Sequence, residues 1–222
     1  MRIGALAAIG TCVVMALSAA TAARAQDATT SWNGFYGELS LGGRFATARQ
    51  KFSNNNSTGE YSVDGIIGGA GIGHDWQLGR FVIGTEAEMS GASSNGIAHQ
   101  PNTRFNYVTA NDWLGIIGAR AGYDLGLPVL PFVTAGVAVG NVAVHDYRPN
   151  GPGTSVDYSG IEPGWTVGAG VESQVFWSHL SVKAEYRYVS LDYAKGTGSA
   201  NSGVAASFNQ NIVQASLVYR LN

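Results

Sequence analysis

A histidine and a serine lie two positions apart at His179-Leu180-Ser181, a spacing that a hydrolase can use. A serine nucleophile needs a histidine base within hydrogen-bond reach, and that base needs a third group to orient it. Leu191 occupies the position where the orienting Glu is sought, and the pair falls at a short connection between two strand-like segments. We therefore interpret the spacing as accidental, and we expect the chain not to be an enzyme and to have no catalytic residues.

The four histidines do not form a metal-binding pattern. His74, His99, His145 and His179 lie in separate regions, and the adjacent carboxylates are those of His74-Asp75 and His145-Asp146. A metal site in a protein brings several ligands together in one cluster. We expect no metal site and no cofactor, with these histidines on loops or at strand ends.

The segment 1–25 resembles a secretory signal peptide. Arg2 precedes an apolar run from Ile3 to Leu17. This run is too short for a transmembrane helix, which needs roughly 20 residues. The segment closes on the A-x-A pattern of Ala23-Arg24-Ala25, so we expect cleavage before Gln26. The expected domains are a signal peptide at 1–25 and one domain at 26–222. Cys12 would leave with the signal peptide, so no disulfide is expected.

The composition excludes a nucleic-acid-binding protein. The formal net charge is −2, charged residues make up 13% of the chain, and no basic block occurs. Proteins that bind nucleic acid carry a basic patch or stripe instead. The 31 glycines are unusual for strand-rich segments, but they suit strands that bend or that approach another backbone closely. This composition leaves a soluble β-sandwich, a lipocalin-like barrel and a membrane barrel open.

Eight segments alternate between an apolar face and a face of charged residues or glycine. In the clearest segment, Phe81, Ile83 and Met89 share one face while Glu86 and Glu88 share the other. The segments are about Asn33–Ala46, Ser62–Gln77, Arg80–Ser90, Val108–Asp124, Val129–Val144, Ile161–Phe176, Leu180–Leu191 and Asn209–Leu221.

Three features favour strands that cross a membrane over strands of a soluble protein. The segments are long enough for tilted membrane strands, and aromatic residues such as Trp76, Trp113 and Tyr219 gather near their ends. The connections also alternate between tight turns and long polar loops, which is typical of membrane barrels. The expected loops span 47–61, 91–107, 145–160 and 192–208. Because every backbone polar group in a bilayer needs a protein partner, we predict an all-β fold: an eight-stranded antiparallel transmembrane β-barrel with short periplasmic turns and four long extracellular loops.

The polar face of this barrel would point inward, where eight strands leave room only for side chains. Opposite charges are expected to pair there in a structural network, because isolated charges would be very costly. The alternative is a narrow porin-like pathway for small solutes or ions, which the even mixture of signs does not favour. The predicted network contains Glu38, Arg44, Glu86, Glu88, Arg120, Glu172, Lys183, Glu185, Arg187 and Arg220.

Several segments resemble the small outer-membrane immunogenic proteins of alphaproteobacteria, a porin family of eight-stranded relatives of the OmpA membrane domain. The resemblance lies in Trp32-Asn33-Gly34-Phe35-Tyr36, in 113–123, in 131–138, and above all in Gly164–Glu172 followed by Val182–Tyr188. Barrels of this kind usually end in an aromatic residue that helps the assembly machinery recognise the last strand. This chain departs from that pattern because it ends in Tyr219-Arg220-Leu221-Asn222.

The resemblance implies a bacterial outer-membrane protein that contributes to envelope integrity and displays surface antigens. The expected partners are outer-membrane lipid, lipopolysaccharide and the barrel-assembly machinery. Aromatics among the polar loop residues, such as Tyr147 and Tyr158, suit adhesion to host surface molecules and equally suit loops that pack on each other. Haem binding through the loop residues His99 and His145 is a further alternative. No oligomeric state is predicted.

Overall fold

The computed structural model describes residues 31–51, 61–94, 97–99, 106–110, 112–147, 157–175, 179–197 and 203–221. The expected signal peptide and the middle of each long connection lie outside these residues. No helix in the described residues is long and apolar enough to cross a membrane. The strands are β1 (Gly34–Lys51), β2 (Tyr61–Leu78), β3 (Phe81–Ser94), β4 (Ile97–His99), β5 (Asn106–Ala110), β6 (Trp113–Tyr123), β7 (Val129–Tyr147), β8 (Asp157–Gln174), β9 (Leu180–Thr197) and β10 (Gly203–Arg220).

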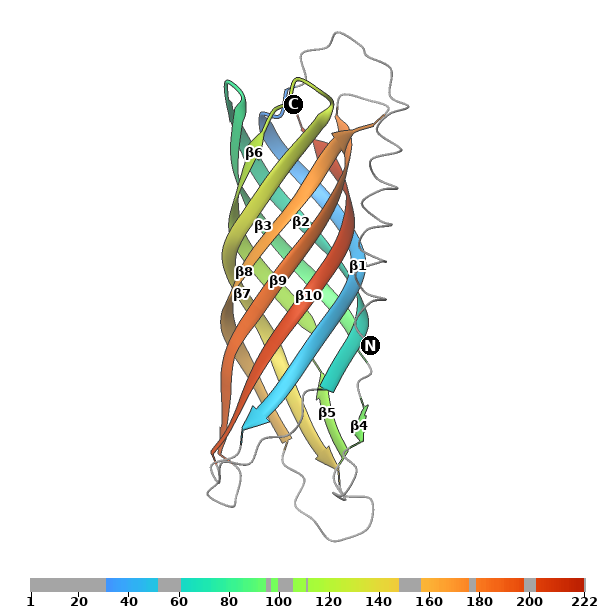
Figure 1. Ribbon diagram of the computed structural model, residues 1–222, viewed down its shortest axis with the longest axis vertical. Coiled ribbons are helices and arrows are strands. Elements are labelled where there is room, and N and C mark those ends of the chain that lie inside the picture. Colours follow the sequence, from blue (N-terminus) through green and yellow to red (C-terminus); the bar gives the residue numbers. More distant parts are fainter. Residues whose placement is uncertain are drawn as a thin grey trace.

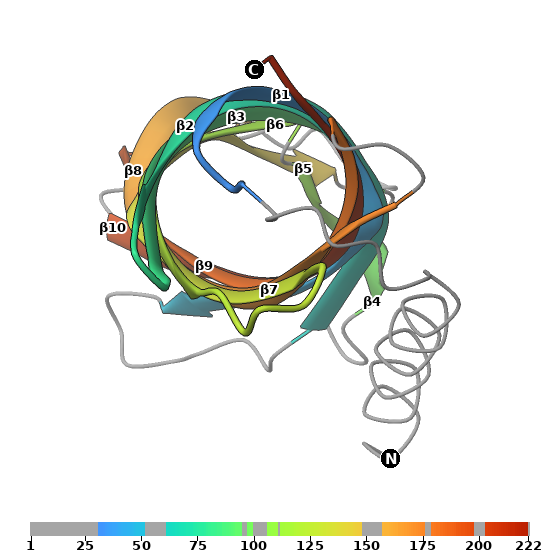
Figure 2. The same cartoon turned by 90° about the horizontal axis from the view of Figure 1, so that it is seen from above.

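Eight of these strands close into an antiparallel barrel, which confirms the predicted fold class. Neighbouring strands pair in the order β1-β2-β3-β6-β7-β8-β9-β10, and β10 pairs back onto β1. Figure 1 shows the strands crossing the long axis at a tilt, and Figure 2 shows the closed ring from above. In a closed ring every strand has a partner on both sides. The backbone polar groups of the strands are then paired within the protein, as a bilayer requires.

The strand boundaries differ from the predicted ones at the end that carries the long connections. β1 continues to Lys51, β7 to Tyr147 and β9 to Thr197, so parts of the four expected loops are strand. The fourth expected strand is divided: β5 and β6 both pair with β7, and β4 adds a short hairpin strand to β5. The extensions are mostly polar in sequence, so they lack the alternation that reveals a strand.

Short turns close the opposite end of the barrel. β2 and β3 are joined by Gly79 and Arg80, and Gly79 has a φ of 65°, a conformation that favours glycine. Gly126, in the turn between β6 and β7, has a φ of 72°, and its N–H donates to Asp124 Oδ1 at 2.8 Å. We call this end the short-turn end and the other the long-connection end.

The outer wall is apolar, as the alternation predicts. Leu39 and Leu41 on β1 and Ile72 on β2 are about two-thirds exposed. The charged residues Glu38, Arg44 and Asp75 of the same strands are instead buried in the interior. On β1 the outward aromatics Phe35 and Phe45 bound this band. Ten residue steps at about 3.3 Å, tilted by about 40°, give an apolar height of roughly 25 Å, the thickness expected for an outer-membrane barrel.

Candidate functional site: the filled barrel interior

Four charged side chains form a closed ring inside the barrel. Asp75, Arg120, Glu172 and Arg220 come from β2, β6, β8 and β10, which are alternate strands of the barrel, and their signs alternate. Around this charge ring the nitrogen–oxygen distances are 3.6 Å from Arg120 to Asp75, 2.8 Å from Arg120 to Glu172, 2.8 Å from Arg220 to Glu172 and 3.0 Å from Arg220 to Asp75. Each charge therefore has two opposite neighbours and no net charge is left in the ring.

Aromatic rings pack against the two guanidinium groups of the charge ring. The guanidinium carbon of Arg120 lies 4.6 Å from the ring centroid of Phe132, and that of Arg220 lies 5.4 Å from the centroid of Tyr36. These rings come from β7 and β1, between the strands that carry the charges. Such contacts favour a buried cation over the ring face, so the arginines are held by both charge and stacking.

A second set of charges lies next along the barrel, towards the long-connection end. We call it the cross-lumen cluster; it contains Glu38, Glu86, Glu88, Lys183, Glu185 and Arg187. Lys183 Nζ lies 2.5 Å from Glu38 Oε2. Arg187 on β9 donates to Glu86 at 2.7 Å and to Glu88 at 2.9 Å, both on β3, and to its own strand's Glu185 at 2.8 Å. Hydroxyl groups also donate hydrogen bonds to these carboxylates. Glu88 accepts from Ser40 and Ser90 at 3.0 Å, and Glu185 accepts from Thr134 at 2.9 Å.

Inward-facing glycines make the space for these large side chains. A Cβ added to Gly84 on β3 would collide with Asp75 Oδ1 and approach Arg120 Cγ to 3.1 Å. A Cβ added to Gly73 would collide with the Tyr36 ring, and one added to Gly170 would lie 2.7 Å from Phe132 Cζ. The inward glycines of the alternating pattern are therefore the steric counterparts of charged and aromatic residues on adjacent strands.

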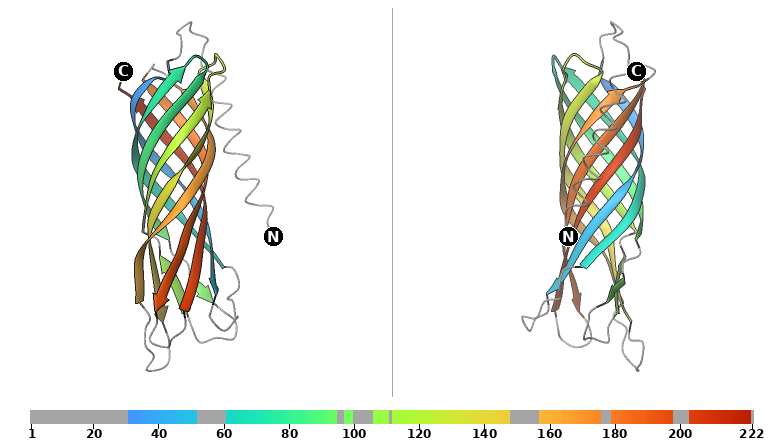
Figure 3. Two further views of the ribbon diagram at one scale, coloured as in Figure 1. Left: turned by 90° about the vertical axis from the view of Figure 1, so that its left-hand side faces the viewer. Right: turned by 45° about the vertical axis from the view of Figure 1, so that its right-hand side comes forward.

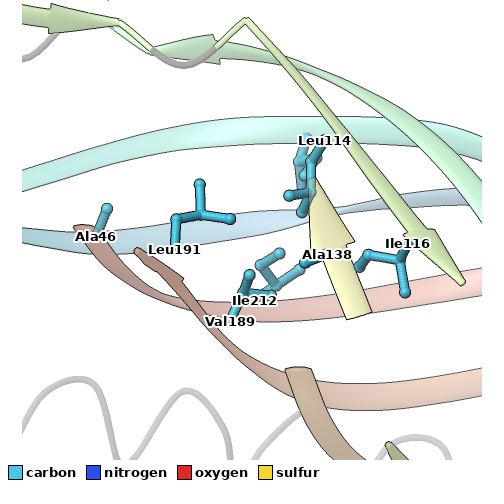
Figure 4. Packing of buried hydrophobic residues seen from close by; sticks show 8 residues of the cluster. Ala46, Leu114, Ile116, Ala138, Val189, Leu191 and Ile212 are labelled. Carbon is cyan, nitrogen blue, oxygen red and sulfur yellow. The ribbon is translucent and has the colours of Figure 1, made fainter. Parts of the chain in front are cut away.

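Buried apolar layers lie beyond both sets of charges. At the short-turn end Trp32, Val82 and Leu130 are fully buried, and Arg220 donates to the Trp32 carbonyl oxygen at 2.8 Å. At the long-connection end lies an apolar layer, shown in Figure 4. It consists of Ala46, Ile67, Leu114, Ile116, Ala138, Val189, Leu191 and Ile212.

Each residue of the predicted network lies in the barrel interior with at most 5% of its surface exposed. Nine of the ten belong to the charge ring or the cross-lumen cluster, whereas Arg44 lies apart from both, opposite Ile212 at the apolar layer. Arg44 has interactions of its own there. The predicted network does not contain Asp75, although Asp75 lies on the polar face of its segment, opposite the face of Ile72 and Trp76. The network also omitted the inward aromatics Trp32, Tyr36 and Phe132. Their inward orientation could have been predicted from their positions in the alternation between the two faces.

The His179-Leu180-Ser181 pair is not arranged for catalysis. Ser181 Oγ is buried and donates to Glu172 at 2.6 Å, so the hydroxyl belongs to the charge ring. His179 is exposed at the turn, with its ring 6.3 Å from that of Tyr219. Among the residues that the structure describes, no three His, Cys, Asp or Glu side chains are grouped to hold a metal ion.

The sequence matches a known family over almost its whole length. Residues 9–220 match the family described as "Outer membrane protein beta-barrel domain". The chain belongs to this family. It is 34% identical over 180 residues to a 22 kDa outer membrane protein of Rhizobium leguminosarum bv. viciae, covering 78% of this chain and 72% of the relative. It is 29% identical over 220 residues to the 31 kDa outer-membrane immunogenic protein of Brucella melitensis biotype 1, covering 94% and 90% respectively.

Solved outer-membrane barrels are among the structures to which the chain is similar. The crystal structure of Neisserial surface protein A aligns with a TM-score of 0.46 and 18% identity, covering 85% of this chain and 97% of that protein. As a member of the outer membrane β-barrel family, the chain is located in the bacterial outer membrane. Outer-membrane barrels have their short turns in the periplasm, so the short-turn end is periplasmic and the long-connection end is extracellular.

Proposed function

We propose that this protein is a closed-lumen barrel of the outer membrane that contributes to envelope integrity with its wall and displays antigenic or adhesive segments at the cell surface. One observation carries the proposal: Arg187 on β9 reaches Glu86 and Glu88 on β3, the strand opposite it in the barrel. Buried charges among the described residues span the width of the interior, and apolar layers lie above and below them, which supports a lumen closed to solutes. We therefore assign the function to two other parts of the protein. These are the outer wall, which faces lipid and lipopolysaccharide, and the extracellular segments.

A narrow porin-like channel is the rival function. Eight-stranded barrels fill their interiors with side chains, whereas wider barrels leave an aqueous channel. Reconstituting the purified protein in planar bilayers separates the two functions. We expect no steady conductance under conditions in which a general porin conducts, and reproducible single-channel steps would overturn the closed-lumen proposal.

The surface role is supported by the relatives, six of which are described as outer-membrane immunogenic proteins. In this chain the segments that would be displayed connect β1 to β2, β3 to β6, β7 to β8 and β9 to β10. A variant lacking 150–156 removes one of these segments while leaving the bounds of β7 and β8 intact. We expect this variant to lose recognition by antibodies or host cells directed at that segment. Unchanged recognition would exclude the segment from the surface role.

The structural role needs a separate test, because a displayed segment and a stabilising wall are independent. A strain without the protein should become more sensitive to detergents and large antibiotics. The variant lacking 150–156 should restore resistance as well as the complete chain does, since its wall is unchanged. If the strain without the protein keeps full resistance to detergents and large antibiotics, the proposed contribution to envelope integrity is refuted.

We assign no catalytic step to this protein. Ser181 is held by Glu172, and His179 is exposed at the periplasmic turn. A His179→Ala variant should keep every property of the parent protein. Loss of a lipid A deacylase or protease activity in that variant, measured against the parent, would overturn this assignment.

A further inference from the structure

The pairing between β8 and β9 stops before either strand ends. The last pair of this ladder towards the extracellular end is Gly164↔Leu191. β8 nevertheless starts at Asp157 and stays paired with β7 as far as His145↔Asp157, and β9 continues to Thr197, which pairs with Gly203 of β10. Two strand edges therefore face each other without pairing. We call residues 157–163 the β8 edge and residues 192–197 the β9 edge.

Two local features separate the edges. Pro163 follows the last paired residue of β8 towards the extracellular end, and proline has no N–H with which to continue a ladder. On β9, the pairs Ala206↔Ala194 and Phe208↔Leu191 place Asp192 and Tyr193 opposite the single residue Ser207. This bulge bends β9 at the point where its pairing with β8 ends. The separation is thus built into the sequence of both strands.

A second separation lies on the other side of the barrel. Pairing between β3 and β6 ends at Gly91↔Trp113, and pairing between β2 and β3 ends at Gly65↔Ser94. Beyond the membrane the strands therefore form two four-stranded sheets, β9-β10-β1-β2 and β4-β5-β7-β8, whose ends splay apart in Figure 3. The second sheet ends there in β4, which is three residues long. Short edge strands resist pairing with other chains, whereas longer ones invite it.

We propose that the β8 and β9 edges pair with those of a second copy of this chain, each β8 edge with the β9 edge of the other copy. All copies have the same orientation in the membrane, so β8 of one copy runs antiparallel to β9 of the next. A two-fold axis along the membrane normal makes the two pairings equivalent. A single foreign strand inserted between the edges would be antiparallel to one and parallel to the other, whereas a second copy is antiparallel at both.

The wall directly below the two edges suits such an interface. Trp165 on β8 and Tyr186 and Tyr188 on β9 face outward there, and the rings of Trp165 and Tyr188 lie 5.4 Å apart. The residue paired with Tyr186 is the small outward residue Ala169. Tyrosine and tryptophan are enriched in the cores of protein interfaces. The aromatic patch therefore continues the proposed contact into the membrane zone.

Cross-linking between differently tagged copies tests the proposal. If the second copy continues the β8–β9 register, Ile161 of one chain lies opposite position 194 of the other. One chain carries Ile161→Cys and the other Ala194→Cys, both with Cys12→Ser, and the two are co-expressed and treated in intact cells with a short bis-maleimide. We expect a product with both tags at twice the chain mass. Replacing Ile161→Cys by Ile66→Cys should abolish it, because Ile66 is equally exposed but lies on β2, across the barrel.

A measurement on the unsubstituted protein guards against artefacts of the cysteines. In nanodiscs that hold two copies, the amides of 157–162 and 192–197 should exchange hydrogen more slowly than in nanodiscs that hold one. Equal exchange together with the absence of the two-tag product would overturn the proposal. A cross-linked product of another mass, formed with Ile161→Cys alone, would also overturn it and would identify a foreign polypeptide at the edges. The test does not depend on whether the lumen conducts.

Discussion

Arg187 on β9 donates to Glu86 on β3 at 2.7 Å, and three strands separate β9 from β3 in either direction around the barrel. One arginine and one glutamate thus bridge the full width of the lumen. Because both side chains are almost completely buried, the bridge lies in a medium where an unpaired charge is costly. The relationship ties two opposite walls of the barrel together.

Replacing Arg187 by methionine should destabilise the folded barrel by about 3–5 kcal/mol, because Glu86, Glu88 and Glu185 would keep their buried charges without this partner. The measurement is urea-induced unfolding of the barrel in lipid vesicles, followed by tryptophan fluorescence. Arg80→Met, in an exposed periplasmic turn, is the matched control and should change stability by less than about 0.5 kcal/mol. Equal effects of the two substitutions would show that the bridge contributes nothing specific.

Gly84→Ala should prevent or strongly impair folding. The added methyl group would collide with the Asp75 carboxylate and with the backbone oxygen of His74, which lies 2.9 Å from the added Cβ and cannot move freely. Gly91→Ala, on the same strand, is the control, because its nearest neighbour is 3.9 Å away. Heat-modifiable migration in gel electrophoresis reports the folded fraction of each variant. A fully folded Gly84→Ala protein would refute the steric role of this glycine.

Leu41→Arg should cost about 2–4 kcal/mol, as expected for a cation on the lipid face near the middle of a barrel wall. The Leu41 side chain is largely exposed in the structure, so in a soluble barrel the same substitution would be nearly neutral. Unfolding in vesicles measures the cost, and Leu41→Ala separates lost apolar area from the added charge. A neutral result for Leu41→Arg would contradict the outward orientation of this face.

The alternation in the sequence was sufficient to predict the barrel, its lipid face and the inward side of each strand. It could not predict which charges meet, because that depends on the stagger between strands far apart in the chain. Asp75 joins the charge ring through Arg220, 145 residues away, whereas Arg44 on a neighbouring strand does not. The apolar layer was missed at Leu114-Gly115-Ile116-Ile117, where inward and outward residues are both apolar and the alternation disappears.

Gln210→Met should stabilise the barrel by about 1–3 kcal/mol, the cost of burying an unsatisfied polar group. Gln210 is fully buried beside Ala46 and Val189 of the apolar layer, and neither its amide nitrogen nor its oxygen has a hydrogen-bond partner among the described residues. Methionine has a similar length and carries no polar hydrogen.

Gln214→Met, further along the inward face of β10, provides the comparison because Gln214 donates to Glu88 at 3.3 Å. We expect this second substitution to destabilise, since it leaves the Glu88 carboxylate with one donor fewer. Urea midpoints of the two variants therefore should move in opposite directions, and a loss of stability in both would mean that the Gln210 amide is satisfied in the folded protein.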